Sequence, residues 1–373
     1  MLLKGIRVLD LSTLLPGPMC SLFLADLGAE VIKVESLKGD MMRRFESHKG
    51  KSPYFSALNR NKKSIAINLK TSKGKQVFMK LAENADVIIE GFRPGKVGAL
   101  GIDYHNVKKI NPKIIYCSIT GYGQEGKYKD KAGHDLNYSS LSGMLDVLSS
   151  RPFVPGIQIA DISCAFIAAF SIAAALFSRE RNGKGDYIDV SVFNSALCTI
   201  SMHIAQRSAC CKSDTLSGKM PCYNVYRTKD GKHVSLGAIE GKFWQSFCTA
   251  ANRKGLLTKQ FDISAVGELE SLFKSKTRKE WIKLNKKYDF CCEPVNTVEE
   301  AINEPYNKSK FIEIDGIRQA AMPFIFSSLG KTRHSRAPNL GENTKEMLLL
   351  AGCDKKSAEE LIKEGVAASY ENL

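Results

Sequence analysis

The sequence lacks the short motifs that mark several common classes of enzyme. It contains no G-x-x-x-x-G-K-[ST] phosphate-binding loop, no G-x-S-x-G nucleophile elbow and no H-E-x-x-H zinc motif. Its 11 cysteines are an odd number, and none of them forms a C-x-x-C pair. These absences argue against a P-loop nucleotidase, a serine hydrolase, a zinc site and a disulfide-stapled fold, and they favour a reducing compartment.

Acidic residues are few relative to basic ones. The 373-residue chain has 54 Lys and Arg against 39 Asp and Glu, which gives a net charge of +15. Such an excess favours anionic partners, namely phosphorylated cofactors, nucleic acid or a membrane surface, without choosing among them. Nucleic-acid readers usually carry a known module or interleave basic residues with exposed aromatics, and neither is seen, so runs such as 278–287 are interpreted as solvated helix faces. With 43% hydrophobic and 25% charged residues, two or three globular domains are expected.

One stretch, 157–177, is nearly all apolar and has the length of a membrane span, about 20 residues. It contains Asp161 near its start, and an aspartate within a span costs on the order of 2.5–3.5 kcal/mol. We therefore expect a buried helix of a soluble protein and no membrane partner. Neither a charged-then-apolar signal segment nor a Ser-Lys-Leu ending is seen, so a cytoplasmic location is expected, with an organelle left open.

Strand and helix patterns alternate through the first half of the chain. Short runs rich in β-branched residues predict strands, and amphipathic stretches between them predict helices. The predicted strands are 5–11, 29–34, 64–69, 86–92, 113–120 and 187–193, and the predicted helices include 19–27 and 73–84. Continuous apolar runs suit strands that are buried on both faces. This order predicts an α/β fold with a doubly wound parallel sheet.

The pattern changes in the second half of the chain. Residues 196–219 are polar and small and predict a linker, whereas 221–238 predict a β-hairpin. A basic helical stretch follows at 242–287. We therefore expect a large domain over 1–195 and a smaller α+β domain over 220–318.

The segment 132–138 (AGHDLNY) is the clearest candidate for acid–base chemistry. It places His134 beside an aspartate in a glycine-containing loop after the predicted strand 113–120. Histidine is the side chain whose usual pKa lies nearest neutrality, which suits proton transfer. The alternative is a surface or capping pair, which is the more common role of such neighbours.

Other candidate residues follow predicted strands or accompany basic runs. Arg93 stands between glycines after the strand 86–92, where ligands of open α/β sheets bind, and a solvated loop arginine is the alternative. Tyr122 lies in GYGQEG (121–126), which matches G-x-G-x-x-G, but the patternless residues after it favour a flexible active-site loop over a dinucleotide site. Lys62 is a candidate to line a phosphate path.

Asp161 and Glu240 are acidic residues whose role the local sequence leaves open. Asp161 stands at the head of the apolar stretch, where helix capping alone explains it. Burial would raise the pKa of its carboxyl and a helix N-terminus would lower it, and the sequence does not decide between the two effects. Glu240 follows a predicted strand and, taken alone, is an ordinary loop glutamate.

Several segments together resemble one family over essentially the whole chain. They are LPGP (15–18), ADLGAEVIKVE (25–35), NKKSIAINLK (61–70), EGFRPG (90–95), TGYGQ (120–124), AGHDLNY (132–138) and LGENT (340–344). This combination resembles the family III CoA-transferase superfamily. Within it, AGHDLNY, YRTKDG (226–231) and GAIE (237–240) resemble the α-methylacyl-CoA racemase branch, whose members act in lipid metabolism.

The resemblance implies an architecture and a set of catalytic residues. It implies a Rossmann-like large domain completed by residues 325–373, a smaller domain, and a homodimer of two interlocked chains. The positions His134 and Asp161 match the catalytic residues of the racemases, and Glu240 matches the partner of His134.

The resemblance also implies how coenzyme A is held. Arg93 matches a contact of the CoA phosphates, and Lys38, Lys62 and Tyr122 are further candidate contacts. We expect no cofactor beyond the CoA moiety of the substrate, and no metal.

Racemisation of a 2-methylacyl-CoA thioester sets clear chemical demands. A weakly acidic α-proton must leave one face of the carbon, and a proton must return to the other face. His134 and Asp161 would be the two bases, and Glu240 would orient the imidazole. Backbone N–H groups at the start of the Asp161 helix would receive the enolate oxygen.

Two other functions are weighed against this one. In a CoA-transferase of the same family, Asp161 would be a nucleophile that forms a mixed anhydride and then an aspartyl-CoA thioester. Transferases usually lack the histidine and carry a glycine-rich loop in the small domain, so His134 favours the racemase. A basic binding protein without enzymatic activity is the remaining alternative, and salt-insensitive binding of an acyl-CoA would speak against it.

Overall fold

The computed structural model describes residues 1–47, 50–149, 151–209, 215–327 and 334–372. The chain divides into two compact units. The first comprises Met1–Met144, Val154–Thr199 and Lys310–Leu373, and the second comprises Leu145–Phe153 and Ile200–Ser309. Residues 310–318, which the sequence places with the small domain, therefore cluster with the first unit.

The first unit is built on a seven-stranded sheet in the order β12-β3-β2-β1-β4-β5-β6. Its strands are β1 (Arg7–Asp10), β2 (Glu30–Glu35), β3 (Lys62–Ile67), β4 (Val87–Glu90), β5 (Ile115–Thr120), β6 (Asp186–Ser191) and β12 (Ala367–Ala368). The strands β1 to β6 are parallel, and β12 runs antiparallel to β3. The order reverses between β1 and β4, as in a doubly wound Rossmann-like sheet. The predicted fold class is confirmed.

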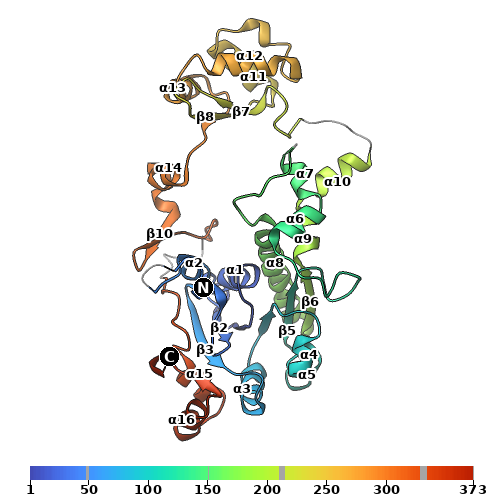
Figure 1. Ribbon diagram of the computed structural model, residues 1–373, viewed down its shortest axis with the longest axis vertical. Coiled ribbons are helices and arrows are strands. Elements are labelled where there is room, and N and C mark those ends of the chain that lie inside the picture. The colour runs from blue at the N-terminus through green and yellow to red at the C-terminus, as the bar shows by residue number, and fades with distance from the viewer. Residues whose placement is uncertain (48–49, 150, 210–214, 328–333, 373) are drawn as a thin grey trace. The chain divides into compact units, whose positions relative to one another are not determined.

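Helices cover both faces of this sheet because its central strands are apolar on both. On one face, α1 (Pro16–Asp26) packs on β1 and β2 and beside α8 (Ile159–Asn182). The other face is covered by α3 (Ser72–Glu83), α5 (Tyr104–Ile110) and α15 (Thr344–Leu350), which share one apolar core with alternate strand residues such as Leu9 and Ile32. Figure 1 shows both layers. Proline begins α1, where its missing N–H costs nothing.

The end of the chain returns to the first unit. The strand β12 pairs with β3 through Ala367 and Ile67, and α16 (Lys355–Lys363) packs on α15. In Figure 1 this red segment lies beside β3 and α3. The hairpin of β10 (Phe311–Ile314) and β11 (Ile317–Ala320) carries the buried Gln319, whose side chain accepts a hydrogen bond from Arg60 at 3.1 Å. Both ends of the chain therefore build this unit.

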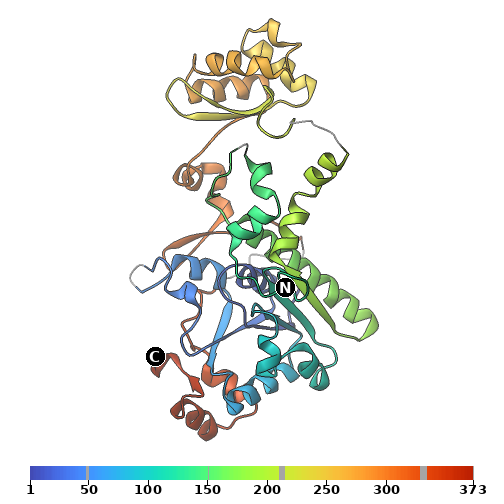
Figure 2. The same cartoon turned by 45° about the vertical axis from the view of Figure 1, so that its right-hand side comes forward.

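The long helix α8 contains the apolar stretch noted in the sequence, and one side of it is buried. Residues spaced four apart, among them Cys164 and Ala168, are buried, and the helix packs on α1, β5, β6 and α9 (Val192–Thr199). Figure 2 shows α8 in green along the strands. Phe170 and Phe177 are 76% and 66% exposed. Among the described residues, α8 has the length and composition of a membrane span, which core helices of soluble proteins also have. The expectation of a buried helix thus holds for one side only.

The second unit has its own aromatic core. Its antiparallel sheet joins β7 (Tyr223–Arg227), β8 (His233–Gly237) and β9 (Cys292–Pro294), and it packs with α11 (Gly241–Ala250), α12 (Val266–Phe273) and α13 (Arg278–Tyr288). Tyr226 stacks on Phe273 with ring centroids 4.5 Å apart. This is the hairpin and the helical stretch that the sequence predicts. Within the predicted linker 196–219, α10 (Ser201–Ser208) is a helix, and 210–214 lie outside the described residues.

Short helices complete the two units. They are α2 (Pro53–Asn59), α4 (Lys96–Leu100), α6 (Asp135–Leu141), α7 (Met144–Leu148) and α14 (Val298–Asn303).

Four buried charged side chains form a network beside the end of β1. The ammonium of Lys33 lies 3.0 Å from the carboxylate of Asp40, and that of Lys62 lies 3.3 Å from Asp10. Lys33 also donates to the carbonyl of Ser12 at 2.9 Å. Because buried charges are costly unless they are paired and hydrogen-bonded, these contacts fix the loop that follows β1.

Lys33→Met tests this network, because it removes the buried ammonium and leaves Asp40 without its ion pair. We expect the free energy of unfolding to fall by about 3–5 kcal/mol in urea denaturation. Lys73→Met is the control, because Lys73 pairs with Glu364 at the exposed surface and such pairs contribute less than about 1 kcal/mol. Equal losses in the two variants would contradict the stabilising role of the network.

Candidate active site

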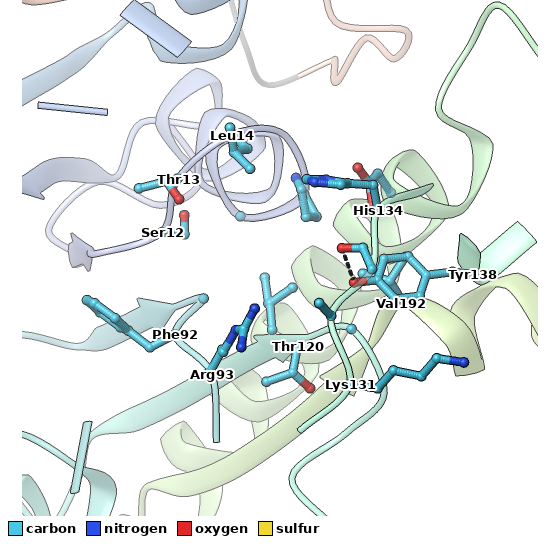
Figure 3. A pocket seen from close by; sticks show the side chains of 18 of the residues that line it. Ser12, Thr13, Leu14, Phe92, Arg93, Thr120, Lys131, His134, Tyr138 and Val192 are labelled. Carbon is cyan, nitrogen blue, oxygen red and sulfur yellow. Dashed lines mark hydrogen bonds between the residues drawn. The ribbon is translucent and has the colours of Figure 1, made fainter. Parts of the chain in front are cut away.

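A cavity of about 490 Å³ opens at the carboxyl ends of the parallel strands. Its walls are the loops that follow β1, β4 and β5, the residues around the start of α6, and the first turn of α8. The side chains that line it include Ser12, Thr13, Arg93, His134 and Tyr138 (Figure 3). Asp161 lines it as well. It lies where the strand order reverses between β1 and β4, because the loops after these two strands diverge there. All of its lining residues belong to the first unit.

The loop after β1 forms one wall, and buried groups hold it in place. Asp10 accepts the N–H of Ser12 at 3.0 Å, and Asp40 accepts the N–H of Leu14 at 3.3 Å. Leu14 has a φ of 65°, a left-handed conformation that is uncommon for a residue with a Cβ atom. A Cβ at Gly17 would overlap the side chain of Ser12, so the glycine of the LPGP segment permits this close packing.

Arg93 extends into the cavity from the loop after β4, as Figure 3 shows. This loop begins at the buried Glu90, whose carboxylate accepts the N–H of Phe92 at 2.8 Å and the hydroxyl of Ser118. Burial raises the pKa of Glu90 to about 7, and the charge of Asp189 acts in the same direction. Glu90 thus positions the turn that carries Arg93. An exposed guanidinium at this edge of the sheet suits a phosphate or a carboxylate.

His134 is the residue that immediately precedes α6, and its side chain is exposed to the cavity. Figure 3 shows its imidazole and the guanidinium of Arg93 directed into the same open space. The backbone N–H of His134 donates to Asn137 at 3.0 Å. The buried Tyr138 donates its hydroxyl to the carbonyl of Gly133 at 2.7 Å, so the loop before His134 is anchored to α6. A Cβ at Gly133 or Gly121 would overlap the ring of Tyr138, which explains both glycines.

Asp161 lines the same cavity from the first turn of α8. Burial raises the pKa of its carboxyl to about 7, and the neighbouring charge of Asp135 acts in the same direction. Of the two opposing effects that the sequence left open, the structure therefore favours burial, and the charge of Asp135 adds to it. A carboxyl with such a pKa exists in both protonation states at neutral pH.

Part of the expected oxyanion site at the start of α8 is already hydrogen-bonded in this structure. The N–H of Asp161 donates to the carboxylate of Asp135 at 3.0 Å. The N–H groups of Ile159 and Ile162 donate to backbone carbonyls at 3.1 and 3.0 Å. A side chain from α6 thus caps the start of α8, which the sequence around Asp161 does not reveal, and the oxyanion site there stays a prediction.

Three candidate CoA contacts lie outside the cavity lining. Lys62 is buried, and its ammonium is bonded to Asp10, Asn59 and the carbonyl of Pro18. Burial lowers its pKa to about 8. Lys62 therefore supports the loop after β1, and this geometry gives no support to its role as a ligand contact. Lys38 is exposed. Tyr122 is buried and packs edge-on against Tyr138, with ring centroids 5.0 Å apart.

Glu240 belongs to the second unit and stands immediately before α11. It is exposed, and the buried core around Trp244 and Phe247 fixes the helix that it precedes. Its pairing with His134 stays a prediction.

Several residues of the cavity were not singled out from the sequence. Tyr138 lies in the quoted segment AGHDLNY but carried no assigned role, and Lys129 and Lys131 lie in the patternless stretch after GYGQEG. The glycines at 121 and 133 were a signal for close packing, but they do not name Tyr138 as the residue that fills the space. In the part of the chain that the structure describes, no three His, Cys, Asp or Glu side chains are grouped to hold a metal ion.

Known proteins similar to this chain include both racemases and CoA-transferases. The chain is 31% identical to the human α-methylacyl-CoA racemase over 387 residues, which cover 99% of this chain and 98% of that protein. It is equally 31% identical to the human succinyl-CoA:glutarate CoA-transferase over 398 residues, which cover 99% of this chain and 90% of that protein.

The fold is also that of solved structures. The crystal structure of a CAIB/BAIF family protein from Brucella suis superimposes with a TM-score of 0.83 and 29% sequence identity, covering 94% of this chain and 99% of that one. The family model described as CoA-transferase family III matches residues 3–344. With its strand order, its cavity at the strand ends and these relatives, the chain belongs to CoA-transferase family III, a family of enzymes that act on CoA thioesters.

Proposed function

We propose that this protein is a racemase of 2-methyl-branched acyl-CoA thioesters. The observation that carries the proposal is that His134 and Asp161, which come from different elements, line one cavity that Arg93 also enters. A racemase needs a base on each side of one carbon, and a nearby cation suits the phosphates of CoA.

The chemistry follows from these groups. One base removes the α-proton, and the electron pair of the C–H bond moves into the thioester carbonyl to give an enolate. The conjugate acid of the other base then delivers a proton to the opposite face, and the electron pair returns to carbon. The pKa of Asp161, about 7, supports both of its roles, since its carboxylate accepts a proton in one direction and its acid form donates one in the other.

The second candidate is CoA transfer between carboxylic acids. It is supported by transferase relatives that are as similar to this chain as the racemases. In that reaction Asp161 would attack the thioester carbonyl, which forms a mixed anhydride and releases CoA as a thiolate. The thiolate would then attack the aspartyl carbonyl, which forms an aspartyl-CoA thioester and releases the first acid as its carboxylate. Attack by a carboxylate needs no second base, so the presence of His134 in the cavity favours the racemase.

Further features of the enzyme are proposed on the same basis. The CoA moiety of the substrate would be its only cofactor, with no metal, and Glu240 would orient His134. A homodimer is supported by the exposed Phe170 and Phe177 on α8, because large exposed apolar patches mark association surfaces. We also propose that the enzyme is cytoplasmic and binds neither nucleic acid nor a membrane.

The two reactions are separated by incubating the protein with an (S)-2-methylacyl-CoA in deuterated water. We expect deuterium to enter the α-position with loss of stereochemistry, because the two bases exchange protons with solvent. This exchange should need no added carboxylic acid as an acceptor of CoA. Nuclear magnetic resonance and chiral chromatography measure both changes. CoA transfer to added succinate through a hydroxylamine-sensitive intermediate, without α-exchange, would identify a transferase instead.

His134→Ala and Asp161→Asn each remove one proposed base. We expect each variant to lose racemisation by roughly 10²–10⁴-fold, the contribution of one general acid–base group. Equilibrium binding of a non-reactive acyl-CoA ether, measured by calorimetry, should change little, since neither side chain is assigned to CoA. Normal turnover in either variant would refute its role as a base.

Arg93→Ala tests the assignment of the CoA phosphates. We expect KM for the acyl-CoA to rise by roughly ten- to hundredfold with a smaller change in kcat, because a charge-assisted hydrogen bond contributes about 1.5–3 kcal/mol. Lys96→Ala is the matched control, since Lys96 is an exposed cation of α4 outside the cavity lining. An unchanged KM in Arg93→Ala, or an equal rise in both variants, would remove Arg93 from the site.

A further inference from the structure

Asp135 connects the two segments that carry the proposed bases, and the proposed mechanism gives it no role in transferring a proton. It follows His134 directly as the first residue of α6, and it is only 8% exposed. One oxygen of its carboxylate accepts the backbone N–H of Asp161 at 3.0 Å, and the other lies 3.5 Å from the hydroxyl of Ser139 on the next turn of α6. Its backbone therefore continues from His134, while its side chain holds the first turn of α8.

We propose that Asp135 is a positioning residue that sets the working state of Asp161, by anchoring the start of α8 and by holding a fixed negative charge beside that carboxyl. The inference rests on the proposed function and deepens it. The side chain of Asp135 joins the segment of His134 to the start of α8. The distance between the two bases therefore depends on this contact.

The surroundings of Asp161 make the charge of Asp135 effective. Asp161 is itself half-buried, and buried charges interact in a medium less polar than water. The titratable or charged groups around it come from the loop after β4, the segment after β5, α6 and α8. They are Arg93, Lys129, Lys131, His134, Asp135, Tyr138 and Cys164. Among these, Asp135 is the group whose charge acts on the pKa of Asp161, in the same direction as burial.

The direction of the effect follows from like-charge repulsion. Two carboxylates held close together do not both ionise readily, so the charge of Asp135 helps to raise the pKa of Asp161 to about 7. Above that pH the carboxylate of Asp161 predominates, and below it the acid predominates. A base of this strength takes a proton from a weakly acidic carbon more readily than an ordinary aspartate, whose pKa is about 3.9. Without the charge of Asp135, burial remains as a cause and the pKa falls.

The test compares the full-length protein with Asp135→Asn, whose amide oxygen still accepts the N–H of Asp161 but carries no charge. Protein labelled with ¹³C at the aspartate carboxyl carbons is titrated by NMR, and the Asp161 signal is assigned by its loss in Asp161→Asn. We expect a midpoint of about 7 in the wild type and one lower by on the order of 1 pH unit in Asp135→Asn. Asp146→Asn is the control, because the side chain of Asp146 is 72% exposed, and it should leave the midpoint unchanged.

The pH profile of α-proton exchange gives a second readout that a purely structural role would not move. The limb that reports ionisation of Asp161 should shift to lower pH in Asp135→Asn, and the plateau rate at high pH should fall by up to about tenfold as the base weakens. Asp135→Glu, which restores a charge, should bring the limb back toward the wild-type position.

The outcomes separate this inference from the proposed function. A wild-type protein that does not exchange the α-proton refutes the racemase, and the NMR titration still decides the role of Asp135. An unchanged Asp161 midpoint in Asp135→Asn, or a wild-type midpoint near that of an ordinary aspartate, overturns the inference whatever the activity. If Asp135→Asn does not fold, Asp135→Ser, which also accepts an N–H and carries no charge, takes its place.

Discussion

The reversal of strand order between β1 and β4 is the constraint on which the site depends. The loops after these strands leave the sheet in different directions, so a cavity opens between them without any insertion. The loop after β1 supplies Ser12 and Thr13, and the loop after β4 supplies Arg93. The segment after β5 brings His134 to the same edge, and α8 begins beside it with Asp161. A parallel sheet thus collects groups that are far apart in the chain.

Three of the cavity segments are held by a buried acid that accepts a backbone N–H. Asp10 binds the N–H of Ser12, Glu90 binds the N–H of the residue before Arg93, and Asp135 binds the N–H of Asp161. Buried carboxylates are costly unless their oxygens are hydrogen-bonded, and here backbone N–H groups provide those bonds. The reactive groups remain open to a ligand while their supports stay inside the fold. The contacts of these buried acids therefore stabilise the loops, and the charge of one of them, Asp135, also helps to raise the pKa of Asp161.

Much of the fold could be predicted because its signals are local. Apolar runs such as Val87–Glu90 and proline at the start of α1 produce strands and helix starts wherever they occur. The exposure of a long side chain is not a local property, and this is why the sequence did not reveal that Lys62 is buried. Its neighbours in the sequence are basic, yet its ammonium is buried against Asp10 from another strand. The side chain that caps α8 likewise belongs to α6, so the residues near Asp161 in the sequence do not predict this cap.

The sequence by itself determined the parallel α/β architecture, the position of Arg93 at a strand end, and the family to which the histidine and the two acidic residues point. These follow from hydrophobic periodicity, from turn residues and from short sequence motifs that resemble those of the family. The tertiary structure decided that His134 and Asp161 share one cavity, that Asp161 has a raised pKa, and that Lys62 is a support within the fold. The physical reason is that burial and electrostatic fields arise from groups brought together in space, which the order of residues along the chain does not specify.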